Sequence, residues 1–176
     1  MTRIGRTGLA LALAAATLAA AGCGYTLVGR ASNIPDDVRA VFLQPLENAT
    51  ARVQVDQILS RALADELVTR QRFAVLSSAE GADAEIAGSV VGFVVNPVSF
   101  DADGRATEYE ISITAKMSFR RLAPEQVLWQ NDRYTFSQSY QLEASELGYQ
   151  DRETAAITAT AKKFAETVIT DLLEGF

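Results

Sequence analysis

The segment between Glu108 and Arg120 alternates apolar and polar side chains without a break. Every second residue is apolar, namely Tyr109, Ile111, Ile113, Ala115, Met117 and Phe119. Successive side chains of a β-strand point to opposite faces, so this period of two predicts a strand with one buried face and one face in water. A turn over residues 122–125 follows, and residues 127–138 are expected to pair antiparallel with this strand. The pattern therefore predicts a long hairpin that belongs to a sheet.

Three further β-rich runs precede this hairpin. They predict strands over residues 38–43, 73–76 and 85–96. Proline donates no backbone hydrogen bond, so Pro97 is expected to end the third run. Gly88 and Gly92 lie inside that run and indicate a bend, a bulge or a close approach of the backbone.

Two stretches carry apolar residues at helical spacing, residues 51–70 and 152–176. The apolar residues of the first helix that recur at helical spacing are Val55, Leu59, Ala62 and Leu67, with Ile58 and Leu63 beside them. Those of the second helix are Ile157, Ala161, Phe164, Val168 and Leu172. Asn48 or Thr50 is expected to cap the start of the first helix, because short polar side chains accept hydrogen bonds from its free N–H groups.

The order of these elements predicts the fold class. It is an α+β fold in which two helices pack on one face of a mostly antiparallel, mixed sheet of four to five strands. The first strand–helix–strand unit is expected to place its two strands parallel.

The first residues predict a targeting segment. Arg3 and Arg6 precede an uncharged stretch, residues 8–21, built from Ala, Leu, Gly and Thr. This stretch is shorter than the roughly 20 residues of a membrane-spanning helix and has the length of the apolar part of a signal peptide. We therefore expect a cleaved signal peptide over residues 1–22, a lipidated N-terminus and linker over residues 23–37, and a folded domain over residues 38–176.

Composition excludes several functions. The chain has 22 acidic and 16 basic residues, a net charge of −6, no histidine and one cysteine. A net acidic chain without a basic block is a poor nucleic-acid binder. A single cysteine allows no internal disulfide and no cysteine cluster for zinc. No catalytic motif is present, so the sequence predicts no enzyme, no cofactor and no metal site.

The residues around Cys23 resemble a known signal. The run from Leu18 to Cys23 is similar to a bacterial lipobox. This resemblance implies that the thiol of Cys23 carries a diacylglyceryl group, and that the new amino terminus receives an acyl chain such as palmitate. Gly24 follows instead of Asp, which in the sorting rule of many Gram-negative lipoproteins favours the outer membrane.

The domain resembles the LptE family of lipopolysaccharide-assembly lipoproteins. The likeness is carried by the Cys-Gly-Tyr start at residues 23–25, by Ile34-Pro35, by Leu-Glu-Asn-Ala-Thr at residues 46–50 and by Ala-Asp-Ala-Glu-Ile at residues 82–86. It implies two helices on a four-stranded sheet that sits as a plug in the β-barrel subunit, an LptD-like protein, of the lipopolysaccharide translocon. The implied role is to help assemble that barrel and to deliver lipopolysaccharide to the outer leaflet. The domain would lie on the periplasmic side of the outer membrane or inside the barrel.

Contacts with lipopolysaccharide phosphates need basic side chains. Basic residues on or beside the hairpin are Arg105, Lys116, Arg120, Arg121 and Arg133. The candidates for lipopolysaccharide contact are Arg120 and Arg121, which are adjacent at a strand end. The alternative interpretation is that these are ordinary solvated charges beside a turn.

A second functional class stays open on the sequence alone. The opening order of strand, polar loop, helix and strand is similar to that of outer-membrane lipoproteins that activate peptidoglycan synthases, and of accessory lipoproteins of secretion channels. The Cys-Gly-Tyr start and the long hairpin favour the translocon hypothesis.

Overall fold

The computed structural model describes residues 34–141 and 149–174, with the side chains of the last segment described from Thr154. The chain divides into two units, Met1–Ala31 and Ser32–Phe176, and the fold described here is that of the second unit. Its elements are, in order, β1 (Ala40–Leu43), β2 (Glu47–Asn48), α2 (Val55–Arg70), β3 (Ala74–Leu76), β4 (Ala84–Phe100), β5 (Ala106–Leu122), β6 (Glu125–Gln141) and α3 (Tyr149–Glu174).

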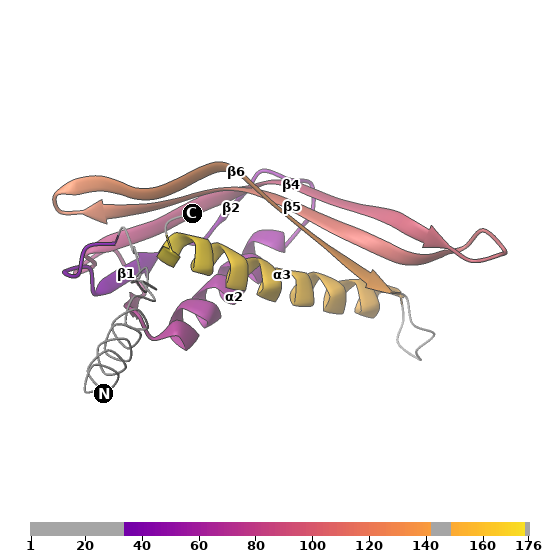
Figure 1. Ribbon diagram of the computed structural model, residues 1–176, viewed down its shortest axis with the longest axis horizontal. Helices are drawn as coiled ribbons and strands as arrows, with labels where there is room; N and C mark the ends of the chain where they lie inside the picture. Colours follow the sequence, from indigo (N-terminus) through magenta and orange to yellow (C-terminus); the bar gives the residue numbers. More distant parts are fainter. Residues whose placement is uncertain (1–33, 142–148, 175–176) are drawn as a thin grey trace, which may run out of the picture. The chain divides into compact units, whose positions relative to one another are not determined.

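One mixed sheet carries the fold. Its strand order is β3-β1-β4-β5-β6, with β2 also paired to β4. β1 lies parallel to both β3 and β4, whereas β4, β5 and β6 form an antiparallel meander. Both helices cover the same face of this sheet (Figure 1). The predicted α+β class, with two helices on one face of a mostly antiparallel sheet, is confirmed.

β5 lies at the centre of the meander and follows the predicted alternation. Its residues Ile111, Ile113, Ala115, Met117 and Phe119 are at most 2% exposed. The residues between them face away from the helices and keep contact with water. Burying a large aliphatic or aromatic side chain stabilises a fold by about 1.5–3 kcal/mol, so this one strand supplies much of the core.

The two helices complete the core. α3 buries Ile157, Ala161, Phe164, Val168 and Leu172, as its apolar spacing predicts. α2 buries Val55, Leu59, Leu63 and Leu67, all of which belong to its predicted apolar positions. Ala62 is partly buried at the side of this stripe.

An aromatic cluster joins β6 to α3. The rings of Tyr134 and Phe136 meet Phe164 edge-on, with centroids 5.8 and 6.3 Å away. Trp129 packs against Tyr134 and is 8% exposed. The hydroxyl of Tyr134 donates a 2.6 Å hydrogen bond to Asp171 on α3. Burial, together with this carboxylate, raises the pKa of Tyr134 well above its ordinary value.

The start of α2 differs from the prediction. The helix begins at Val55 rather than Ala51, and its N-cap is Gln54, which makes no side-chain cap hydrogen bond. The expected cap by Asn48 or Thr50 is therefore wrong. Asn48 instead accepts hydrogen bonds from the amide and hydroxyl of Thr50, at 2.9 and 2.8 Å, and organises the loop before the helix. Asn and Asp side chains often form such local turns, which compete with helical structure.

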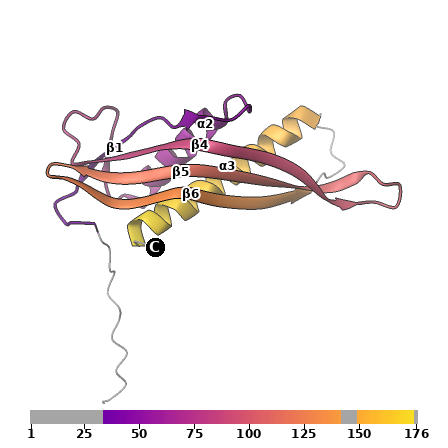
Figure 2. The same ribbon diagram turned by 90° about the horizontal axis from the view of Figure 1, so that it is seen from above.

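β4 also differs from the prediction, because it continues through Pro97 to Phe100. β1 and β2 pair with β4 only as far as Val90. Pro97 lies further along, where this edge of β4 has no neighbouring strand, so the missing N–H of the proline costs no hydrogen bond there. The pairing with β5 shifts register between Val90 and Gly92 and again after Pro97. The tip of the β4–β5 hairpin extends past both helices (Figures 1 and 2).

Candidate functional site

Arg120 and Arg121, the two sequence candidates, lie on opposite faces of β5. Arg120 follows the buried Phe119 and points away from the helices, as neighbouring residues of a strand alternate. Arg121 points to the helix face, beside the loop that precedes β1. The structure therefore separates two residues that are adjacent in sequence.

Arg120 lies between two carboxylates. Its guanidinium is 2.9 Å from Glu85 on β4 and 3.1 Å from Glu125 at the hairpin turn. The hydrogen bond to Glu85, with the charge of Glu125, raises the pKa of Arg120 above its ordinary value. The side chain is still 44% exposed.

Arg121 is part of the scaffold. Its guanidinium forms an ion pair with Asp37 and its side chain is 20% exposed. Nearby, Asp83 accepts hydrogen bonds from the amides of Arg39 and Ala40, at 2.9 and 2.8 Å. These two backbone hydrogen bonds, and the charge of Arg121, hold the pKa of Asp83 below its ordinary value. The cluster fixes the chain as it enters β1, and this leaves Arg121 less suited to a ligand than Arg120.

A polar hollow of about 400 Å³ adjoins Arg120. Its walls come from β2, β4, β5, β6 and the loop between β1 and β2. The polar side chains that line it are Gln44, Glu47, Ser89, Lys116, Ser118, Arg120, Gln130 and Asp132. Lys116 is exposed and has no ion-pair partner within the described ranges. Lys116, Arg120 and several hydroxyl and amide groups can contact a phosphate or a sugar here. The net attraction is limited by Glu85 and Glu125, which pair with Arg120, and by the lining carboxylates of Glu47 and Asp132.

Sequence reasoning placed Lys116 near the hairpin but not with Arg120. The register of β5 brings Ser89 opposite Lys116, and Ser118 opposite Gln130. Lys116, Ser118 and Arg120 occupy every second position of β5. The alternation in the sequence therefore could have predicted that they share one face of the sheet. Gln130 reaches the hollow because the β5–β6 pairing shifts register, and no local sequence pattern predicts this position.

Beyond the hollow, hydroxyl side chains pair across β5 and β6 on the open sheet face, with Val94 of β4 opposite Ser112. Ser112 and Ser137 are hydrogen-bonded across β5 and β6 at 2.8 Å, and Thr114 and Thr135 at 3.3 Å. These pairs make a low, polar surface without long side chains. Such a surface can lie close against another polar wall.

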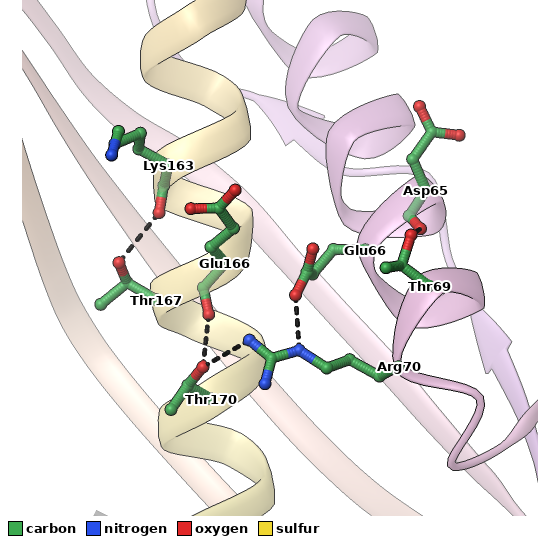
Figure 3. Close-up of polar contacts among 8 residues, drawn as sticks. All are labelled: Asp65, Glu66, Thr69, Arg70, Lys163, Glu166, Thr167 and Thr170. Atoms are coloured by element: carbon green, nitrogen blue, oxygen red, sulfur yellow. Dashed lines mark hydrogen bonds and ion pairs between the residues drawn. The ribbon is translucent and has the colours of Figure 1, made fainter.

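A second hollow, of about 760 Å³, lies between the helices. Arg61 on α2 and Lys162 on α3 contribute to its lining, together with Asp65 and Glu66. At one end the helices are tied by Arg70, whose Nη2 donates to the hydroxyl of Thr170 at 2.9 Å while its Nε lies 2.5 Å from Glu66 (Figure 3). This mixture of charges belongs to a helix–helix contact rather than to a catalytic arrangement.

Neither a metal cluster nor a membrane-spanning helix occurs in the part of the chain that the structure describes. No group of three or more Asp, Glu, Cys or His side chains is placed to hold a metal ion in residues 34–141 and 149–174. In the same part of the chain, none of the helices has the length and hydropathy needed to cross a membrane.

Solved structures share this fold. The hypothetical protein CT253 from Chlamydia trachomatis is 10% identical, with a TM-score of 0.54, and the match covers 78% of this chain and 96% of that one. A single-substitution variant of the PelC dodecamer from Paraburkholderia phytofirmans is 14% identical, with a TM-score of 0.50 over 77% of this chain and 88% of that one. At such low identity these likenesses concern the fold alone. A comparison with curated proteins finds no match.

The fold that carries the polar hollow is thus a mixed sheet with two helices on one face. The family model LptE, described as lipopolysaccharide-assembly, matches residues 38–172, and the chain belongs to this family. It is accordingly an outer-membrane lipoprotein of lipopolysaccharide assembly, in a family of non-enzymatic accessory lipoproteins.

Proposed function

We propose that this chain is the lipid-anchored plug of the β-barrel lipopolysaccharide translocon, where it helps the barrel to assemble and lipopolysaccharide to reach the outer leaflet. The observation that carries this proposal is the family match, which spans residues 38–172 and so includes every strand and nearly all of both helices. The proposal needs no catalytic group. It needs a stable domain, a surface that fits a barrel and a tether at the correct membrane.

The open sheet face suits the inside of a barrel. Large outer-membrane barrels have polar interiors, and the Ser112–Ser137 and Thr114–Thr135 pairs offer a polar surface of low relief. The hollow beside Lys116 and Arg120 offers the groups that a lipopolysaccharide phosphate needs. Arg121 serves mainly to hold Asp37, so we assign the contact to Lys116 and Arg120.

Cys23 is the proposed anchor and lies outside the described residues. On this proposal residues 1–22 are removed, residues 23–37 tether the domain, and residues 38–176 form the plug. One acyl chain holds a protein to a membrane only marginally, whereas the two chains of a diacylglyceryl group, alone or with a further acyl chain, give stable attachment.

The test combines fractionation with co-purification. Tagged wild-type protein should fractionate with outer membranes and bring down a large outer-membrane barrel in about equal amount. Cys23→Ala removes the acylated thiol, so this variant should leave the membrane fraction. Unchanged fractionation would exclude lipid attachment at Cys23. Recovery of a penicillin-binding protein in place of a barrel would overturn the plug and favour an activator of peptidoglycan synthesis.

A further inference from the structure

The outer edge of β4 is covered along only half of its length. β1 pairs with Ala84–Ile86, and β2 pairs with Ser89 and Val90. From Val91 to Phe100, none of the strands in the described ranges lies on the edge opposite β5. Alternate residues of an edge strand direct their N–H and C=O groups outward, so this stretch presents unpaired hydrogen-bonding groups.

The same stretch is apolar and uncharged. No charged residue occurs between Glu85 and Asp101. Its exposed apolar side chains are Val91 at 37%, Val94 and Val98 at 49%, and Phe100 at 59%. Phe93 and Val95 of this stretch still pack against the core, and the hairpin tip beyond it extends past both helices (Figure 2). An edge with these properties is a template for pairing with another strand.

The opposite edge of the sheet provides a contrast. β6 is also an edge strand, but Asp132 and Arg133 lie in its middle and the β5–β6 register shifts beside them. Charges and bulges are the devices by which proteins keep edge strands from pairing. β4 also shifts register, between Val90 and Gly92 and after Pro97, but it has no charge from residue 86 to residue 100, so the two edges differ in charge.

We propose that β4 accepts an added strand over Val91–Asn96, and that the occupant is an extended, uncharged segment of the barrel subunit. This inference rests on the proposed function, since it names where the barrel partner binds. Pro97 has no N–H to donate, which limits the pairing to about six residues, or about 20 Å. A charged segment would have to lose water beside valines, so the matching segment is rich in β-branched or aromatic residues.

Two other occupants fit less well. A lipid surface would cover the valines but would leave the N–H and C=O groups of the edge without hydrogen-bond partners. In a second copy of this chain, an antiparallel pairing centred on Val94 would bring residues 98–105 of the copy alongside residues 83–90. β2 already occupies that position at Ser89 and Val90. A segment that turns away after six residues avoids this collision.

Amide hydrogen exchange tests the proposal on the wild-type, detergent-purified lipoprotein, alone and in complex with its barrel subunit. The amides of Val91–Asn96 that face the open edge should exchange at least about tenfold more slowly in the complex. Equal exchange rates in the two samples would overturn the proposal. Protection that appears without the barrel and grows with protein concentration would also overturn it, because the occupant would then be a second copy.

A matched pair of variants gives an independent readout. Val94→Lys puts a charge beside the open edge, at a side chain that is already exposed. We expect it to lower the amount of co-purified barrel about tenfold. Val68→Lys makes the same substitution on α2, at a side chain that is 61% exposed and lies away from the open sheet face and the β4 edge, and should leave the amount unchanged. Full barrel recovery with Val94→Lys contradicts strand addition at β4. Failure of the wild-type protein to recover any barrel contradicts the proposed function itself.

Discussion

Adjacent residues of a strand have different roles in this protein. Arg120 lines a polar hollow and Arg121 secures the loop before β1. The sequence predicted the strand on which both lie, and the same alternation implies that they face apart. The partners were beyond prediction, because Glu85 is 35 residues from Arg120 and Asp37 is 84 residues from Arg121. Only tertiary structure brings such distant carboxylates to these arginines.

Close packing around Gly88 leaves no room for a side chain at this position. A Cβ atom at this position would lie 2.5 Å from the carbonyl oxygen of Lys116 and 2.6 Å from the sulfur of Met117. Backbone on the neighbouring strand cannot easily move, so Gly88→Ala should lower the free energy of unfolding by about 1–3 kcal/mol. Urea denaturation measures the change. Ser89→Ala, on the opposite face, is the control and should stay within about 0.5 kcal/mol of wild type.

The elements were easiest to predict where one local pattern is continuous. The alternation in β5 and the apolar stripe of α3 needed no tertiary information. The extension of β4 past Pro97 depends on an edge that β1 and β2 leave open, and that is a property of the sheet. β2 has two residues, too few to form a recognisable pattern.

The residue that ends α2 has a backbone conformation that is unfavourable for a non-glycine residue. This C-cap residue, Gln71, has φ 52°, in the left-handed region that favours glycine. Gln71→Gly should therefore raise the free energy of unfolding by about 1 kcal/mol. Gln57→Gly places the same substitution inside α2 and should lower it by about 1 kcal/mol. Thermal denaturation of the two variants gives the comparison, and a destabilised Gln71→Gly would show that the left-handed backbone is not costly.

The whole domain shares one core. Residues from β1, β4, β5, β6 and both helices belong to a single buried cluster. Neither helix can leave the sheet without exposing side chains from the other layer, so unfolding should be cooperative. Trp129 is the only tryptophan and sits against the β6–α3 aromatic cluster.

Cooperative unfolding gives a prediction at this scale. Tryptophan fluorescence reports on the β6 layer, and far-ultraviolet circular dichroism reports mainly on the helices. The two transitions in urea should have the same midpoint. Fluorescence that changes before the helical signal would mean that β6 detaches from α3 while the helices persist.

The turn at the end of the β4–β5 hairpin is closed by its own backbone and by Asp101, which accepts hydrogen bonds from the amides of Asp103 and Arg105 at 2.9 and 2.8 Å. Ala102 is exposed between them and lies far from the buried cluster. It is therefore a suitable position for a small dye or spin label that leaves the core intact. A label there would report how far the hairpin tip reaches into the partner when the two proteins bind.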